Sequence, residues 1–510
     1  MKKLIYLFLI VLSFSACDNG FEEMNVDPTK PTALPPNVAI TGIQMYTAGT
    51  SYVASLFYHM GVVMPIMQQL NCTSYTWEYT RSQDARFFDE QFPSSVKGIV
   101  DLVNNLEKAE GPFAETDLAI ANVWKVLVFS RLTDAYGDIP YSEAAKGFIE
   151  GIRFPKYDTQ ESIYADMLRI LEESSNILAK GGENSFGQGD VVYGGDTMKW
   201  KKFANSLMLR LAMRMVKVDP AAAQAWASKA IDAGVMESND DIAYMRFEST
   251  AGYGGVFGPT VNPISRSFAS RFGNQVKMAG TFIDFMKERN DPRVSVLSST
   301  TAGETDFDLQ VGQPNEDRSR TSANSKPNMK IFGGLVGWSW FRSEGNYDAP
   351  FFFQTYAEVE LMLAEAAYRW GLAGGDVEDH YNKGVTSAMT YLKLYEAAAL
   401  TQAGEATITQ AQIDAYLEEN PFNANEALKM INEQYWVASF PNGLETWANW
   451  KRSGYPELVP QEFNWSETDG GIPRRFTYPA TERANNPDNL QEAIDRQGDQ
   501  LTTRIWWDVN

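Results

Sequence analysis

The sequence predicts a mainly α-helical protein whose helices come in pairs and are interrupted once by loops and short strands. The first observation is helical periodicity, which is clearest between Thr197 and Lys217. The second is that several such segments follow one another after short polar turns. The third is a stretch over residues 240–350 with too much glycine, proline, serine and asparagine for long helices. We therefore expect a helical scaffold with one irregular, loop-rich face.

The clearest helix is expected to begin after Asp196, whose side chain suits an N-cap. Its polar side is predicted to carry Lys201, Lys202, Arg210 and Arg214. The sequence "DPAAAQAWASKAIDAG" starts a partner helix within a few residues. The apolar residues recur at helical spacing and predict the buried side: Trp200, Phe203, Ala204, Leu207, Met208, Leu211 and Met215.

Three more helix pairs are predicted, so that the pairs lie mainly within 117–235 and 353–453. In one of them Asp158 and Glu161 have the spacing of a capping box, with aspartate as the cap. Small alanine and glycine residues occur where the two helices of a pair must lie close to each other. The pattern is similar to tetratricopeptide-type repeats, but the spacing is not a strict 34 residues, so a degenerate array is expected.

The first residues have the features of a secretory signal. Lys2 and Lys3 precede a short apolar run, and small residues follow before Cys17. A cysteine directly after such a site resembles a bacterial lipobox, although Phe14 stands where leucine is preferred. The alternative is an ordinary signal with an incidental cysteine. We expect a signal peptide over 1–16, lipid attachment at Cys17, a linker over 17–38 and a single domain over 39–510.

The composition argues against nucleic acid as a partner. Losing Lys2 and Lys3 with the signal takes the formal charge from −21 to −23, and such an acidic surface repels phosphate backbones. After the signal, no segment approaches the roughly 18 uncharged apolar residues of a membrane helix. We therefore expect contact with the membrane through the lipid anchor only.

The stretch "TSYTWEYTR" has the residues of a saccharide-binding platform. If it is extended, Tyr75, Trp77 and Tyr79 point the same way at steps of about 7 Å. Sugar rings have apolar faces that pack on aromatic planes, and Asn71 and Arg81 supply hydrogen-bonding groups nearby. The alternative is a strand that buries the three aromatic rings in the core.

A second aromatic stretch, "GLVGWSWFRSEGNYD", repeats this arrangement. Trp338 and Trp340 share a face if the segment is extended, and the neighbouring glycines favour a loop. Alternating aromatic residues also mark ordinary core strands, so both readings stay open. Near the end of the chain, Trp506 and Trp507 are expected to pack inside the fold.

Catalytic, metal and cofactor motifs are poorly supported. His59 and His380 are the only histidines, Cys72 is isolated, and no phosphate-binding loop or metal-ligand spacing occurs. Three glutamates, at 358, 360 and 365, lie on one predicted helix, where solvated or inter-helix roles are favoured. Asp134 and Asp138 flank a turn, which predicts capping. We expect no catalytic residues, no metal ligands and no cofactor.

Several motifs occur in an order that resembles the SusD/RagB family of outer-membrane nutrient-binding lipoproteins from Bacteroidetes. The strongest is "DAYGDIPYSEA" at 134–144, which follows a helix. The others, spread over nearly the whole chain, are "NVDPTKPT", "WKKFANSLMLRLAMR", "NDPRV", "LMLAEAAYRWG", "ETWANWKRSGYP" and "IPRRFTYPATERANNPDN".

This resemblance implies a SusD-like helical scaffold with an irregular ligand-binding face. It also implies a surface-exposed lipoprotein of the outer membrane that binds a polymeric nutrient, a glycan or in some members a peptide. The expected partner is a SusC-like TonB-dependent transporter. Two other functions stay open at this stage: an acidic helical glycoside hydrolase and a repeat scaffold that binds only protein.

Overall fold

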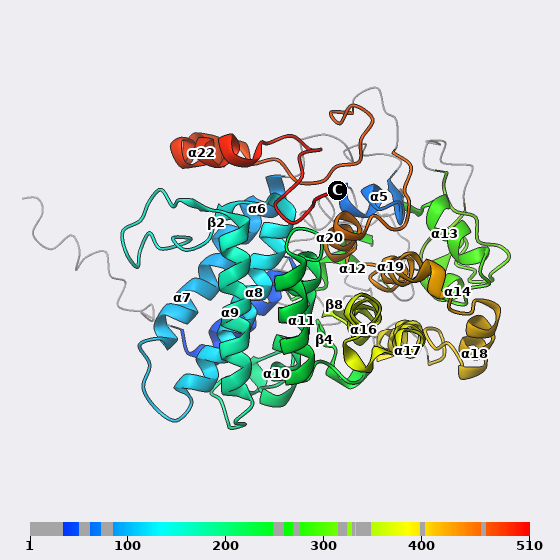
Figure 1. Cartoon of the computed structure of the whole chain (residues 1–510), viewed down its shortest axis with the longest axis horizontal. Helices are drawn as coiled ribbons and strands as arrows, with labels where there is room; N and C mark the ends of the chain where they lie inside the picture. Colours follow the sequence, from blue (N-terminus) through cyan, green and yellow to red (C-terminus); the bar gives the residue numbers. More distant parts are fainter. Residues whose placement is uncertain are drawn as a thin grey trace, which may run out of the picture.

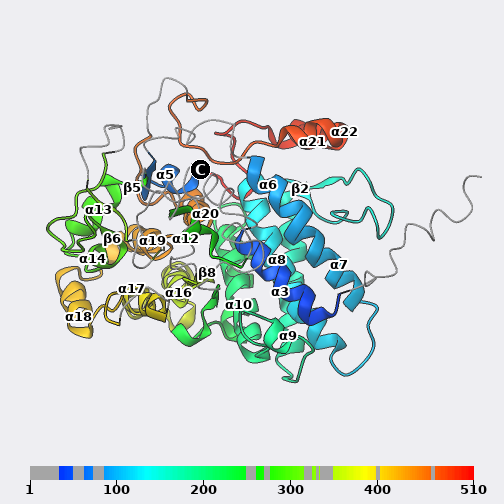
Figure 2. The ribbon, with the colours of Figure 1, turned by 180° about the vertical axis from the view of Figure 1, so that it is seen from behind.

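The structure is a computed structural model (Figure 1). It describes residues 34–49, 62–72, 85–247, 260–268, 276–314, 324–328, 332, 348–397, 403–460 and 466–510. Most helices from the first half of the chain form one side of the molecule, and most helices from the second half form the other (Figures 1 and 2). The helices from residue 480 onward lie over the first side, and the short helix at 64–66 lies with the second. The predicted mainly helical architecture is confirmed.

The first side is built from long helices that pack on their neighbours in sequence. Helix α8 packs against α9, α9 against α10, and α10 against α11. Shorter helices cover them, and α3 begins at Pro36, inside the last residues of the predicted linker. The helices of this side are α3 (Pro36–Ala48), α6 (Ala85–Gln91), the π-helix η2 (Phe92–Val96), α7 (Lys97–Leu106), α8 (Ala114–Tyr136), α9 (Gln160–Leu178), α10 (Thr197–Arg214) and α11 (Pro220–Ala233).

The second side contains the antiparallel pair α16 and α17. The fourth predicted pair is arranged differently, because α19 packs mainly against α16 and α20 while α18 packs against α17. Two further helices near the C-terminus, α21 and α22, contact each other. The helices of this part are α16 (Tyr356–Trp370), α17 (Val377–Thr390), α18 (Gln410–Glu419), α19 (Ala427–Ala438), α20 (Gly443–Ser453), α21 (Ala480–Asn485) and α22 (Pro487–Gln497).

The middle of the chain forms short helices and strands in place of long helices. Its helices are α12 (Pro263–Phe268), α13 (Gly280–Lys287) and α14 (Arg293–Leu297). Within the described residues, the strands form four antiparallel two-stranded ribbons. Their members are β1 (Leu70–Cys72) with β5 (Val276–Met278), β2 (Ile139–Pro140) with β3 (Tyr157–Asp158), β4 (Ala243–Met245) with β8 (Phe351–Gln354), and β6 (Ser298–Ser299) with β7 (Lys326–Pro327). Helix α5 (Met64–Ile66) precedes β1.

The cap of α10 agrees with the sequence prediction, and the cap of α9 differs from it. Asp196 caps α10, and its carboxylate accepts hydrogen bonds from the backbone N–H groups of Met198 and Lys199. Asp219 caps α11 in the same way. The prediction that Asp158 caps α9 is wrong, because Thr159 is the cap. The Asp158 carboxylate instead accepts from the backbone N–H groups of Tyr141 and Ser142.

One hydrophobic core runs through the described residues. Trp200, Leu207 and Leu211 are fully buried on α10, as their spacing predicts. Trp507 is also fully buried, and Trp506 packs edge-on against Tyr164, with ring centroids 5.7 Å apart. None of the described helices combines the length and the hydropathy needed to span a bilayer.

Candidate functional site

An aromatic cavity lies between β8, α16, the 3₁₀-helix η8 (Tyr391–Ala397) and the loop that joins α19 to α20. Its volume is about 20 Å³, which is room for about one water molecule. We call it the aromatic cavity. Its lining residues are Asn262, Ile264, Ser265, Phe332, Ala349, Pro350, Phe351, Phe352, Thr355, Glu358, Tyr391, Tyr395, Ala438, Ser439, Phe440, Pro441 and Asn442.

The rings of this cavity contact one another edge to face. The ring of Phe352 lies 5.1 Å from that of Tyr391 and 5.6 Å from that of Tyr395, measured between centroids. Phe332 extends the cluster to Tyr395 and Phe440 at 5.2 and 5.5 Å. Such contacts hold each ring in one orientation. The cavity therefore has fixed aromatic walls, and its volume is too small for a sugar ring.

Glu358 is the charged residue of the aromatic cavity. It stands in the first turn of α16, where its backbone N–H donates to the Thr355 cap at 3.2 Å. Burial raises the pKa of its carboxyl group, while its ion pair with Arg210 opposes that shift. The carboxylate is thus held by an arginine from α10 behind the cavity wall.

A second, more polar cavity with a volume of about 20 Å³ lies beside the aromatic cavity. The two share Phe351, Phe352 and Asn442. We call the second one the polar cavity, and its lining residues are Ser130, Arg131, Asp134, Ala135, Arg210, Phe351, Phe352, Phe353, Asn442, Leu444, Glu445 and Trp447. Strand β8 thus contributes to both cavities.

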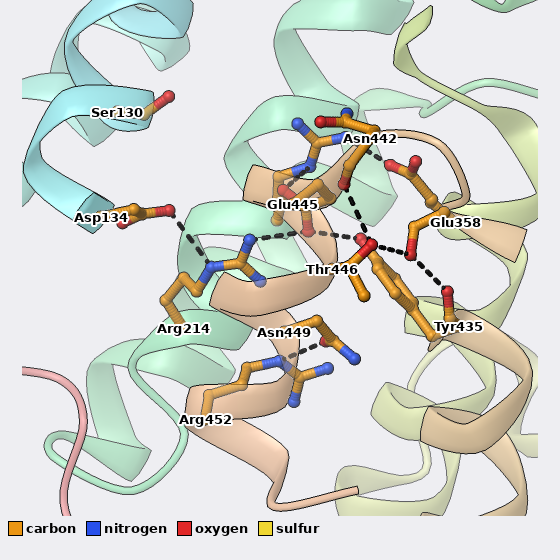
Figure 3. Close-up of polar contacts among 12 residues, drawn as sticks. Ser130, Asp134, Arg214, Glu358, Tyr435, Asn442, Glu445, Thr446, Asn449 and Arg452 are labelled. Carbon is orange, nitrogen blue, oxygen red and sulfur yellow. Dashed lines mark hydrogen bonds and ion pairs between the residues drawn. The ribbon is translucent and has the colours of Figure 1, made fainter. Parts of the chain in front are cut away.

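An ion-pair network behind these cavities joins α8, α10, α16 and α20 (Figure 3). Arg214 Nη2 lies 2.7 Å from Glu445 Oε1, and Arg214 Nε lies 3.4 Å from Asp134 Oδ2. Arg210 pairs with Glu358 and reaches Glu445 Oε2 at 3.4 Å. Because each ion comes from a different helix or helix turn, the network fixes the relative position of the two sides of the molecule.

The network corrects two sequence predictions. Arg210 and Arg214 were expected on the polar side of α10, yet their exposed fractions are only 5% and 1%. Buried arginines need partners, and three carboxylates from other helices supply them. Asp134 was expected to cap a turn, but its carboxylate accepts from Tyr164 and Trp507 and pairs with Arg214. Solvated or inter-helix roles were expected for the three α16 glutamates, and all three take inter-helix roles.

Each of those glutamates is paired. Glu365 bonds to Arg452 and Arg369, and Glu360 bonds to His380 Nδ1 at 2.6 Å. Asp138 accepts a hydrogen bond from the backbone N–H of Gln160, the first residue of α9, at 2.9 Å. Asp138 thus satisfies a free amide at a helix start, which is close to the capping role predicted for it.

Of the candidate ligand residues, the described part of the chain contains Asn71 alone. Asn71 lies on β1, is mostly buried, and donates through Nδ2 to the carbonyl of Pro314 at 3.2 Å. The other candidates lie outside the described residues and stay predictions: Tyr75, Trp77, Tyr79, Arg81, Trp338, Trp340 and the lipid site Cys17.

The ends of the second aromatic stretch are placed by the described residues. Residues 333–347, which contain Trp338 and Trp340, connect Phe332 to the segment that begins at Asp348. Phe332 and Ala349 both line the aromatic cavity. Residues 333–347 thus join, in sequence, two segments that contribute to the cavity wall.

Sequence reasoning missed the rings of the aromatic cavity. Phe351, Phe352 and Phe353 are consecutive, so they show neither helical spacing nor the alternation of the two predicted platforms. Tyr391 and Tyr395 are four residues apart, a spacing that also fits an ordinary helix. The signal that could have found these rings is the run of three phenylalanines shortly before the start of α16.

The described residues contain no group of histidine, cysteine or carboxylate side chains that could hold a metal ion. In both cavities, the carboxylates among the lining residues are paired with arginine: Glu358 with Arg210, Glu445 with Arg210 and Arg214, and Asp134 with Arg214. These ion pairs thus brace the helices around two small cavities.

Solved structures share this architecture. A chitin-binding protein is 31% identical, with a TM-score of 0.78, and the match covers 93% of this chain and all of that one. A SusD-like protein of Bacteroidetes, AC2a, is 24% identical with a TM-score of 0.77, covering 94% of this chain and 100% of that one. A chitin-binding SusD homologue from Flavobacterium johnsoniae is 24% identical with a TM-score of 0.72, covering 93% of this chain and 98% of that one.

None of the curated proteins matches this chain significantly in sequence. The model of one protein family does match, over residues 28–479. That range includes both cavities, the ion-pair network and all but the last segment of the fold. The chain therefore belongs to the SusD-like family that is described as starch-binding and associating with the outer membrane.

Proposed function

We propose that this protein is a lipid-anchored receptor on the outer surface of the outer membrane, which binds an oligosaccharide and delivers it to a TonB-dependent transporter. The observation that carries the proposal is that the chain belongs to the SusD-like family over residues 28–479 and shares its architecture with a chitin-binding protein at 31% identity. The predicted aromatic platforms supply the rings that a binding site for sugars requires. The names of two similar structures include chitin binding, and the family description includes starch.

A non-catalytic role agrees with the chemistry of the cavity walls. Glycoside hydrolysis needs two carboxyl groups, one of them free to donate a proton and both within about 5–10 Å of one another. In the described part of the cavities, the carboxylates are engaged by Arg210 and Arg214. Engaged carboxylates serve better to brace the walls than to attack a glycosidic bond.

Binding is tested by calorimetric titration with starch and chitin oligosaccharides of the same length. We expect saturable binding of at least one of them and the same affinity after hours of incubation, with no reducing sugar released. Release of shorter sugars would replace the proposal by the glycosidase alternative. If no saccharide binds but a transporter still co-purifies, the protein-binding scaffold is the better description.

Delivery is tested separately from binding. The transporter gene expected beside this one should encode a protein that co-purifies with the receptor from outer-membrane extracts. Deleting the receptor should reduce uptake of a labelled oligosaccharide at low concentration, where capture limits transport. Unchanged uptake in the deletion strain would mean that the protein binds saccharide but does not deliver it to the transporter.

A further inference from the structure

A third cavity lies at the edge of the second side of the molecule and is larger than the two described above. Its volume is about 320 Å³, which lies within the range of pockets that hold small ligands. Residues from 292–296, 305, 328 and 404–412 line it, so it lies where α14, the loop after β6, the end of β7 and the start of α18 meet. Both views place α14 and α18 at the same edge of the molecule (Figures 1 and 2). We call this cavity the edge pocket.

Hydrogen bonds within the protein hold the walls of the edge pocket in place. Asn328 is buried, and its Nδ2 donates to the carbonyl of Val296 on α14 at 2.9 Å. On the other wall, Glu396 Oε1 at the end of η8 accepts from the hydroxyl of Thr407 at 2.7 Å and from the backbone N–H of Ala406 at 3.0 Å. A ligand that enters a pocket with fixed walls pays little entropy for ordering them.

Several polar groups that line the edge pocket have unused hydrogen-bonding capacity. The hydroxyls of Ser295 and Thr305 have no hydrogen-bond partner among the described residues, and neither has Nε2 of Gln412. Gln412 Oε1 accepts from the backbone N–H and the hydroxyl of Thr409 in the capping box of α18, which fixes the amide at the pocket. Hydroxyls that both donate and accept, together with amide donors, match a ligand that itself carries many hydroxyl groups.

The rest of the lining argues against charged and flat aromatic ligands. Glu405 is the only charged residue among the described lining residues, so an anion would find no cation there. The described lining also contains no aromatic ring on which a flat ligand could stack. Val296 and Ile408 are mostly buried and supply an apolar part of the wall. These features together favour a neutral ligand with hydroxyl groups and apolar C–H groups, which is the chemistry of a sugar.

We propose that the edge pocket is a second saccharide site, which binds a short neutral sugar by hydrogen bonds and not by ring stacking. The proposal rests on the proposed saccharide binding and adds a site that shares no residue with the two predicted aromatic platforms. The edge pocket adjoins the aromatic cavity, because the backbone N–H of Phe332 donates to the carbonyl of Asn328 at 2.9 Å. Binding is expected to be weak, since hydrogen bonds to the sugar replace hydrogen bonds to water.

The test follows the Ile408 methyl signal by NMR in the full-length mature protein, labelled at its isoleucine methyl groups and assigned with Ile408→Val. The protein is titrated with maltose and, separately, with N,N′-diacetylchitobiose. We expect at least one of the two to shift the Ile408 signal at about millimolar concentration, while the signal of Ile177 on α9 stays unchanged. Glucuronate should shift the Ile408 signal less than glucose does at equal concentration, because the described lining offers no cation.

Three variants tie the signal to the edge pocket. Thr305→Trp places an indole ring in the pocket from a mostly exposed loop and should weaken disaccharide binding at least about tenfold. Its matched control is Thr301→Trp, at an exposed position of the same loop outside the lining, which should bind like the wild type. Ser295→Ala removes one unpaired hydroxyl from α14 and should weaken binding about threefold to tenfold. A thermal melt checks that each variant is folded.

Two results would overturn the proposal. One is disaccharide binding that Thr305→Trp leaves as strong as Thr301→Trp does, or that Ser295→Ala leaves unchanged if Thr305→Trp does not fold. The other is an Ile408 signal that no sugar shifts while starch or chitin oligosaccharides still bind in calorimetric titration, so that saccharide binding stands without a second site. If no saccharide of any length binds, the proposed function itself fails.

Discussion

Arg452 and Glu365 face each other in the core as a two-bond ion pair. Arg452 Nη1 donates to Glu365 Oε1 and Nη2 donates to Oε2, both at 2.8 Å. The pair joins α20 to α16, and Arg369 adds a third bond to Glu365 Oε1 at 2.7 Å. Burial alone would raise the pKa of Glu365, but the two arginines more than reverse this shift and hold the pKa at about 2.

The low pKa of Glu365 predicts a specific loss of stability in acid. The group titrates near 4.5 when unfolded and near 2 when folded, so its contribution is complete above pH 4.5 and is lost as the pH falls toward 2. The shift corresponds to about 3 kcal/mol of unfolding free energy. Urea unfolding at several pH values should show a shallower acid slope for Glu365→Gln, which will be less stable at pH 7 because Arg452 loses its partner.

Glu161→Gln is the matched control for this slope, since Glu161 is an exposed glutamate of α9. Its acid slope should equal that of the wild type. An unchanged slope in Glu365→Gln would mean that other buried carboxylates govern the acid sensitivity of the fold.

Arg214 is expected to be essential for the contact between the two sides of the molecule. Arg214→Met leaves Glu445 and Asp134 without one of their cations in the core, which should cost about 3–5 kcal/mol of unfolding free energy. Arg169→Met removes an arginine that also pairs with two carboxylates, but on the surface, and should cost less than about 1 kcal/mol. Chemical denaturation of both variants compares a buried with an exposed double ion pair.

The packing of α10 gives a prediction that depends on burial alone. Leu207 is fully buried, so Leu207→Ala should lower the unfolding free energy by about 2–5 kcal/mol through lost burial and a residual cavity. Met198, one of the first residues of the same helix, is 46% exposed, and Met198→Ala should change stability by less than about 1 kcal/mol. Equal effects of the two substitutions would contradict the assigned helix face.

The helix α10 shows what could be predicted from the sequence and what could not. Its cap and its apolar side follow from local patterns, because capping and helical spacing involve residues a few positions apart. The burial of Arg210 and Arg214 depends on Glu358 and Glu445, which are 148 and 231 residues away from them. No local pattern marks such partners, so arginine was assigned to the polar side.

The candidate site also has a part that could be predicted from the sequence and a part that could not. Aromatic residues at alternating positions, such as Trp338 and Trp340, can be found in a sequence, whereas the aromatic cavity combines β8, η8 and the loop after α19. The cap of α9 differs for a similar reason. Asp158 is held by the β2–β3 ribbon, whose pairing of Ile139 with Asp158 was not evident from the spacing of Asp158 and Glu161.

Cys17 gives a prediction about the membrane. If this cysteine carries lipid, Cys17→Ala should release the protein from the membrane fraction and abolish metabolic labelling with palmitate, because the anchor supplies the binding. Cys72→Ala is the control, and it should remain labelled and membrane-bound. An unlabelled Cys17→Ala protein that stays in the membrane fraction would contradict lipid anchoring as the means of attachment.

Trp77 gives the prediction that separates a binding platform from a core strand. On a platform, Trp77→Ala should weaken saccharide binding by about 2 kcal/mol or more and leave the melting temperature nearly unchanged. In the core, the same change should cost about 3–5 kcal/mol of stability and leave the affinity of the folded fraction intact. Trp447 is the reference for the second case, because it is buried and donates to the carbonyl of Pro473 at 2.9 Å. Thermal melting and saccharide titration of Trp77→Ala and Trp447→Ala, measured side by side, assign Trp77 to the platform or to the core. If Trp77→Ala loses as much stability as Trp447→Ala, Trp77 is a core residue and does not belong to the ligand face.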